Sequence, residues 1–252
     1  MDREADVVYR YDGSFEGFLC CVFESVYAHE IPFAILPHTS PAATLFPEKL
    51  IQTDREKARR VSDSLPKKLG KGARSCVAHA FLSGSDEKEL LILRFLRLGY
   101  RVGPGVLFMA GHEDVAPVLA LEKQVCGEAH KLTGFVRFQD YGDFLGGTIT
   151  PKNYVLPLLR LHFCARLPGE DFILYDASHG AALLWQKGQA SYAQLDAAPP
   201  FPEISPAEAQ FQALWKQFYK TIAIAARENP ALRRSNCPKR YWVNMTELKD
   251  ER

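Results

Sequence analysis

Three histidines, one arginine and one aspartate lie in the middle of the chain: His130, Arg137, His162, Asp176 and His179. Neutral imidazole is a good metal ligand and titrates near neutral pH, so such a set could form a metal site or an acid–base site. In an enzyme of this kind, His130 or His162 would transfer the proton. Arg137 would hold an anionic group, and Asp176 would orient the histidine.

The same residues also have a purely structural interpretation, which stays open. No two of these histidines have the spacing of a zinc-binding helix, and the chain has no H-E-x-x-H. His162 could be a core histidine, and Asp176 and His179 could be turn residues. The six cysteines form no C-x-x-C pair and mostly lie in apolar patterns, as buried reduced thiols do. We therefore expect no metal and no cofactor, and leave an enzymatic role undecided.

Basic residues are concentrated in residues 49–74, where nine lysines and arginines stand against Asp54, Glu56 and Asp63, with Glu48 directly before the range. A local cationic surface of this kind is what contact with nucleic-acid phosphates requires. A solvated helix face with ion pairs four residues apart would explain much of the same pattern. The residues that we predict to contact nucleic acid are Arg59, Arg60, Lys67, Lys68, Lys71 and Arg74.

The C-terminal tail is a second candidate for nucleic-acid binding, because its cations stand beside aromatic residues. Cationic side chains can hold phosphates while aromatic rings stack on bases. In the alternative, the tail folds back, buries its two aromatic rings and leaves the cations in solvent. The candidate residues are Arg233, Arg234, Lys239, Arg240, Tyr241 and Trp242.

The elements that must position these residues indicate an α+β fold. The N-terminal half is mostly helical, with short strands at 7–11 and 33–36. Hydrophobic residues at helical spacing predict helices over 15–29, 54–69, 71–83 and 86–98. A longer helix over about 113–131 has apolar positions spaced to cover a sheet.

The sheet itself is predicted over about 132–196, as two antiparallel strand pairs joined by one buried helix. Period-two and β-branched patterns predict the strands at 135–138, 146–150, 172–176, 181–185 and 192–195. The helix over 154–166 is apolar on most sides, so we expect it to be buried. A C-terminal helix over 206–227 starts with Ser-Pro-Ala-Glu, a typical cap and first turn.

We divide the chain into residues 1–110, residues 111–198 and residues 199–252, which we expect to form one compact unit. The net charge of +1 neither favours nor excludes a polyanionic partner, so local patches must decide. No apolar run reaches the length of about 18 residues that a membrane span needs. The acidic N-terminus differs from a secretion signal, so we expect a cytoplasmic protein without membrane contact.

Four distinctive segments follow one another along the chain: YDGSFEGFLCCVFESV, EAHKLTGFVRF, VLPLLRLHFCAR with FILYDASHGAALL, and PKRYWVNMTEL. In this order they resemble an uncharacterised bacterial family associated with DNA metabolism and repair. Its members are usually encoded beside a radical-SAM protein, and some are fused to a uracil-DNA glycosylase-like domain. The resemblance covers nearly the whole chain. It implies an association with DNA but no reaction and no catalytic residues.

Three hypotheses follow from the residues and the resemblance. The first is an accessory protein of DNA metabolism or repair that binds nucleic acid, a radical-SAM partner, or both. The second is a protein-interaction adaptor without DNA contact, which would dock through the apolar face of the helix over 206–227 or through the tail. The third is an enzyme that uses His130, Arg137, His162 and Asp176.

Overall fold

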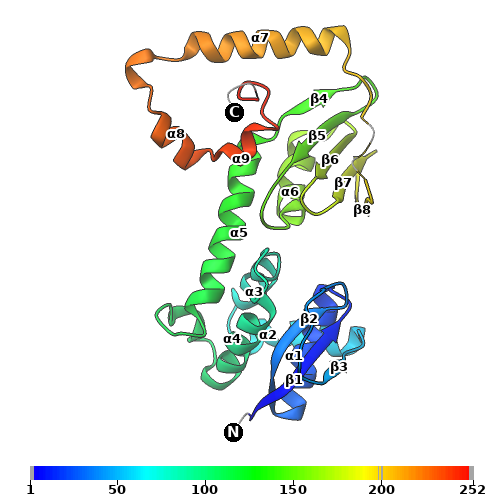
Figure 1. Ribbon diagram of the computed structural model, residues 1–252, viewed down its shortest axis with the longest axis vertical. Helices are drawn as coiled ribbons and strands as arrows, with labels where there is room; N and C mark the ends of the chain where they lie inside the picture. The colour runs from blue at the N-terminus through cyan, green and yellow to red at the C-terminus, as the bar shows by residue number, and fades with distance from the viewer. Residues whose placement is uncertain (1–2, 198, 200, 250–252) are drawn as a thin grey trace. The chain divides into compact units, whose positions relative to one another are not determined.

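The computed structural model describes residues 3–197, 199 and 201–249, and it confirms the α+β class. The chain forms two compact units, Met1–Val125 and Cys126–Arg252, which we call unit 1 and unit 2. The division falls within helix α5 (Ala116–Phe135), which therefore contributes residues to both units. Figure 1 labels the elements of each unit. The three-part division expected from the sequence stays a prediction.

Unit 1 contains a three-stranded, all-parallel sheet in the order β2-β1-β3. The first two strands occur where the sequence predicts them, and helix α1 connects them. The Ser14 hydroxyl caps α1 by accepting from the Gly17 amide, and His29 ends the helix at a positive φ of 54°. The short third strand was not expected, because it has only three residues. The elements are β1 (Arg3–Tyr11), α1 (Phe15–Ala28), β2 (Glu30–Pro37) and β3 (Glu48–Leu50).

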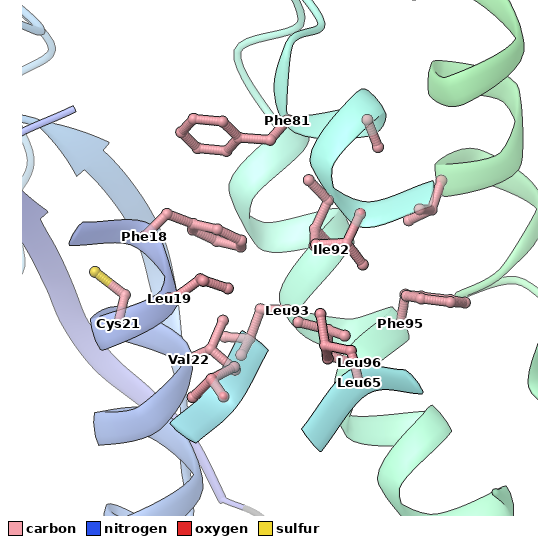
Figure 2. Packing of buried hydrophobic residues seen from close by; sticks show 14 of the residues in the cluster. Phe18, Leu19, Cys21, Val22, Leu65, Phe81, Ile92, Leu93, Phe95 and Leu96 are labelled. Carbon is pink, nitrogen blue, oxygen red and sulfur yellow. The ribbon is translucent and has the colours of Figure 1, made fainter. Parts of the chain in front are cut away.

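Three further helices pack against α1 and form the core of unit 1. Figure 2 shows Phe18 and Leu19 of α1 among side chains of the other helices, including Leu65 and Leu93. Apolar side chains recur at helical spacing in each of them, so burying that stripe stabilises the helices and the unit together. The elements are α2 (Arg55–Lys68), α3 (Ala73–Phe81), α4 (Lys88–Val102) and the short η1 (Val106–Phe108).

Unit 2 contains a five-stranded sheet in the order β4-β5-β6-β7-β8. Strands β4 and β5 form one antiparallel pair, and strands β6, β7 and β8 pair antiparallel in turn. Strands β5 and β6 are parallel, as expected when a helix joins neighbouring strands. The elements are β4 (Phe138–Asp140), β5 (Leu145–Ile149), α6 (Leu156–Arg166), β6 (Phe172–Asp176), β7 (Ala181–Gln186) and β8 (Gln189–Gln194).

The first strand of this sheet begins later than the sequence suggests. We expected a strand over 135–138, but α5 continues to Phe135 and β4 starts at Phe138. Arg137 lies in the link, and its guanidinium donates to the carbonyl oxygens of Gly134 and Val136 at 2.8 and 3.1 Å. These bonds satisfy carbonyl groups at the end of the helix, which would otherwise lack partners.

The C-terminal part of unit 2 is helical. Its longest helix begins where expected, because the Ser205 hydroxyl accepts from the Glu208 amide at 3.1 Å. It ends at Ile222 instead of residue 227, because Ala223 has extended backbone angles. The elements are α7 (Pro206–Ile222), η2 (Ala225–Arg227), α8 (Pro230–Asn236) and α9 (Lys239–Trp242). Among the described residues, no helix combines the length and the apolar character that crossing a membrane requires.

Buried side chains in the core of unit 1 should contribute more to the stability of this unit than exposed side chains do. Replacing Leu93, which is fully buried, with alanine should lower the free energy of unfolding by about 2–5 kcal/mol. The matched change at the fully exposed Leu45 should stay within about 0.5 kcal/mol. Denaturant unfolding of the two variants measures the difference. Equal losses of stability would contradict the packing described for α4.

Candidate functional site

The cations predicted from the sequence in unit 1 lie on α2, at the start of α3 and in the short link between these helices. Asp54 caps α2 by accepting from the amides of Glu56 and Lys57, and the buried face of α2 points toward the core. Lys67 and Lys68 therefore lie on the exposed side of its last turn. We call the following set the α2–α3 basic surface: Arg59, Arg60, Lys67, Lys68, Lys71 and Arg74.

Most of the charge on this surface is not neutralised. Arg59 has one loose contact with Asp63, at 4.0 Å, and both side chains are largely exposed. Arg60 donates to the Tyr27 hydroxyl at 3.0 Å and lies over the ring of Phe23. The other four cations are exposed, and within the described part of the chain none of them has a hydrogen-bond or ion-pair partner. The chain has no acidic residue between Asp63 and Asp86.

We call residues 223–249, which follow α7, the C-terminal segment of unit 2. A buried carboxylate on α5 holds it in place. The Glu128 side chain is 3% exposed and accepts from the Tyr241 hydroxyl at 2.6 Å and from Arg240 at 3.2 Å. It also accepts from the backbone amides of Lys152 and Asn153 and from the Asn153 side chain. Burial alone raises the pKa of Glu128, but these hydrogen bonds outweigh it and lower the pKa below its ordinary value.

A second buried carboxylate holds the end of the same segment. The Glu247 side chain is 2% exposed and receives two hydrogen bonds from Arg137, at 2.6 and 3.2 Å. The indole of Trp215 on α7 donates to it at 2.9 Å. Burial raises the pKa of Glu247, whereas the bonds from Arg137 and Trp215 lower it, and the net shift is downward. One ion pair thus ties the α5–β4 link, α7 and the C-terminal segment together.

The tail residues that we predict to bind nucleic acid belong to the segment that Glu128 and Glu247 hold. The tail is folded back, as in the alternative considered from the sequence. The side chains of Tyr241 and Trp242 are buried, each with 2% exposure. Arg233 and Lys239 lie over the Trp242 ring at 4.9 and 5.6 Å, and Arg240 lies over the ring of Tyr241. Stacking of a base on either ring would require this segment to open. Arg234 is exposed, and the assignment of all six tail residues to nucleic-acid binding stays a prediction.

Within the polar set in the middle of the chain, Asp176 and His179 form a hydrogen-bonded pair. Asp176 is fully buried, and its Oδ2 lies 2.7 Å from His179 Nδ1. Its other oxygen accepts from the amides of Ser178 and His179, which shapes the β6–β7 turn. The carboxylate fixes the orientation of the His179 ring, as in an acid–base dyad. Tyr154 packs edge-on against the same ring at 5.6 Å.

The other candidates of that set have separate environments. His130 is exposed on α5, and Arg137 is paired with Glu247. His162 Nε2 is buried without a hydrogen-bond partner among the described atoms, and its ring packs against Phe163. Within the described residues, no hydrogen bond or ion pair joins His130, Arg137, His162 and Asp176 to one another. A joint catalytic role for them stays a prediction.

A pocket of about 370 Å³ in unit 2 was not anticipated from the sequence. Its walls come from β4 and β5, from α7, from the C-terminal segment and from two stacked aromatic rings. We call it the β4–β5 pocket. The side chains that matter for its chemistry are Gln139, Tyr141, Thr148, Phe201, Gln212, Lys216, Asn244 and Lys249.

The sequence indicates the two buried glutamates in part, but it does not indicate the pocket. Glu128 opens the segment EAHKLTGFVRF, and Glu247 stands in PKRYWVNMTEL. A glutamate in each segment pairs with an arginine of the other, Glu128 with Arg240 and Glu247 with Arg137. The pocket residues gave no such signal, because they are spread over more than a hundred positions and belong to no common motif.

The sequence of this α+β chain, which includes the two buried carboxylates, matches one family model. The model, described as a domain of unknown function (DUF4130), covers residues 86–247, which is well over half of the chain. The protein therefore belongs to the DUF4130 family. The match includes Glu128, Arg137 and Glu247, and it fits the resemblance to an uncharacterised family. No curated protein and no solved structure matches the chain.

The charge of Glu247 should stabilise the protein only where it is ionised. Because its pKa is lowered in the folded state, the contribution is present above the unfolded pKa and is lost as the pH falls through the folded pKa. Glu247→Gln should therefore cost about 3–5 kcal/mol at pH 7. The difference from the wild type should shrink below about pH 4.

Chemical denaturation at pH 7 and at pH 3, followed by tryptophan fluorescence, measures this difference. Glu228→Gln is a matched control, because Glu228 is exposed on the same C-terminal segment. A destabilisation by Glu247→Gln that is equal at both pH values would contradict the role of the ionised carboxylate.

Proposed function

We propose that this protein is an accessory factor of DNA metabolism that binds nucleic acid through the α2–α3 basic surface. The observation that carries the proposal is the group of four exposed cations without partners: Lys67, Lys68, Lys71 and Arg74. They lie within eight consecutive positions. The resemblance to a family associated with DNA metabolism and repair supports the same conclusion.

The distribution of charge supports this role, because the positive charge is concentrated in one patch and is not spread evenly over the protein. The whole chain carries a net charge of +1, so the cations of this surface are balanced by acidic residues elsewhere. A segregated positive patch attracts a polyanion in one orientation, whereas an even distribution does not. Each phosphate contact releases condensed counterions from the nucleic acid, so binding through this surface must weaken as salt increases.

Charge reversal at the centre of the surface should remove most of the binding. We expect Lys67→Glu combined with Lys68→Glu to weaken binding of a duplex or single-stranded oligonucleotide at least tenfold at low salt. The slope of log K against log salt should become shallower by about one for each phosphate that the variant no longer binds. Fluorescence anisotropy over a salt series measures both quantities.

Lys123→Glu is the control for charge and is matched to the single variant Lys67→Glu, since Lys123 is an exposed lysine of α5 in the same unit. It should change the affinity much less than Lys67→Glu does. Undetectable binding of the wild type at low salt would refute the proposal. An equal reduction in affinity for the control would show that only the net charge matters.

A second candidate function, an adaptor for a radical-SAM protein, has one observation in its favour. Helix α7 has a continuous apolar face, and none of its residues is buried. The exposed side chains on this face are Phe211, Leu214, Phe218 and Ile222. Water-exposed apolar surface of this extent is typical of a protein-binding site. The resemblance implies the class of partner, because the related proteins are usually encoded beside a radical-SAM protein.

Glutamates at the centre of this face should disrupt the adaptor role. Leu214→Glu combined with Phe218→Glu should abolish co-elution with a purified radical-SAM protein of the kind that the resemblance implies, because the charges would be buried unpaired. Gln210→Glu combined with Gln217→Glu adds the same charges at exposed polar positions of the helix and should have little effect. Failure of the wild type to co-elute at micromolar concentrations would exclude the adaptor role.

A further inference from the structure

Two aromatic rings of α1 lie stacked at the surface of unit 1. The ring centroids of Phe23 and Tyr27 are 4.2 Å apart, with an angle of 23° between the ring planes. The two residues are one helical turn apart, which is the spacing at which side chains on a helix meet. Tyr27 is nevertheless 60% exposed. Because Phe23 covers only one face of the Tyr27 ring, the other face is open to a ligand.

Cations of α2 hold this pair of rings in place. Lys57 Nζ and Arg60 Cζ each lie 5.3 Å from the centroid of the Phe23 ring, where a cation is attracted to the aromatic face. Arg60 also donates to the Tyr27 hydroxyl at 3.0 Å. Lys57 is paired with Glu24 at 2.7 Å, so it neutralises this carboxylate beside the rings. The rings are therefore ordered before a ligand binds, which lowers the entropy cost of stacking on them.

The accessible cations of the α2–α3 basic surface continue along the same face of α2. Lys67 and Lys68 follow Arg60 at seven and eight positions, so the three side chains lie on one face of the helix. Both lysines are exposed and have no hydrogen-bond or ion-pair partner within the described chain. Seven positions correspond to about 10.5 Å along a helix axis. A strand with one base on the rings can therefore place the phosphates of adjoining nucleotides near the two lysines.

A pocket of about 160 Å³, lined by residues of α1, α2 and α4, includes both rings in its wall. It is smaller than the roughly 300–1,000 Å³ of sites for drug-sized ligands, so it suits a single ring and not a whole nucleotide. Its polar side chains already bond to one another. The hydroxyls of Ser64 and Tyr100 are 2.7 Å apart, and Arg60 bonds to Tyr27. Stacking, and not hydrogen bonding to a base edge, is therefore the contact that this pocket offers, and stacking tolerates any base.

We propose that unit 1 binds single-stranded DNA, with one unpaired base stacked on the Tyr27 and Phe23 rings and the backbone of the same strand on Lys67 and Lys68. This site rests on the proposed function, which supplies the class of polymer, and the rings narrow that class to a single strand. The bases of a duplex are stacked on one another, so they offer no free face to Tyr27. Unpaired bases stack on aromatic side chains beside a cationic surface.

Fluorescence anisotropy of the full chain with three ligands of equal length tests the proposal: a thymidine strand, an abasic strand and a duplex. The wild type should bind the thymidine strand roughly tenfold more tightly than the abasic strand, which has the same phosphates but no bases. It should also bind the thymidine strand more tightly than the duplex. Tyr27→Leu keeps an apolar side chain but removes the ring, so it should weaken binding of the thymidine strand roughly tenfold. Because no phosphate contact is lost, the slope of log K against log salt should stay unchanged.

Three variants control for other effects. Tyr27→Phe keeps the ring and removes the hydrogen bond with Arg60, so it should bind as the wild type does. Phe33→Leu removes another exposed ring of unit 1, on β2, and should also bind as the wild type does. Lys67→Glu combined with Lys68→Glu should weaken binding of all three ligands and make the salt slope shallower.

Failure of the stacking site and failure of the proposed function give different results. A loss of affinity in Tyr27→Leu that is confined to the thymidine strand supports the site. The site alone is overturned if the wild type binds all three ligands equally, if it binds the duplex most tightly, or if Tyr27→Leu binds like Phe33→Leu. An equal loss in Tyr27→Phe and Tyr27→Leu also overturns it, because the hydroxyl would then be the group that matters. Absence of binding to every ligand at low salt overturns both the site and the proposed function.

Discussion

Two buried carboxylates, Glu128 and Glu247, are the constraint on which the arrangement of unit 2 depends. An ionised carboxylate that is removed from water must be paired and hydrogen-bonded, or it destabilises the fold by several kcal/mol. Both groups receive hydrogen bonds from sequence-distant partners. For Glu128 these include Arg240 and Tyr241, and for Glu247 they are Arg137 and Trp215. The lowered pKa of each carboxyl indicates that the charged form is the one that the fold stabilises.

This constraint explains how a pocket can form from parts that are far apart in the sequence. The bidentate contact of Arg137 with Glu247 fixes the C-terminal segment beside the start of β4. The indole of Trp215 joins α7 to the same carboxylate. The amide of Asn244, the side chain of Gln212 and the floor of β5 then line one space. The interaction that stabilises the segment therefore also builds the walls of the β4–β5 pocket.

The helices and strands were predicted from the sequence better than the tertiary contacts between them. Local spacing was enough for the α+β class, for the positions of α1, α2 and α6, and for the two strand pairs of unit 2, because period and capping are local properties. The expected burial of α6 was overestimated, because only Leu156, Leu159 and Phe163 are buried and Leu161 is 73% exposed. The end of α5 was misplaced, since the strand-like FVRF pattern conceals the contacts that Arg137 makes with the helix carbonyls. The pocket could not be predicted, because its residues meet only through tertiary structure. The pairing of Glu247 with Arg137 spans 110 positions for the same reason.

The two groups of cations that the sequence suggested for nucleic-acid binding differ in how accessible their charges are in the folded protein. Arg233, Lys239 and Arg240 lie over the rings of Trp242 and Tyr241, so their charge is partly used within the protein. Lys67, Lys68, Lys71 and Arg74 have no such rings or carboxylates as partners in the described chain, and their charge faces solvent. Similar stretches of sequence therefore have different capacities to bind a polyanion. Because a cation binds phosphate only where its charge is accessible, the cations of unit 1 are the more accessible of the two groups to an anionic partner.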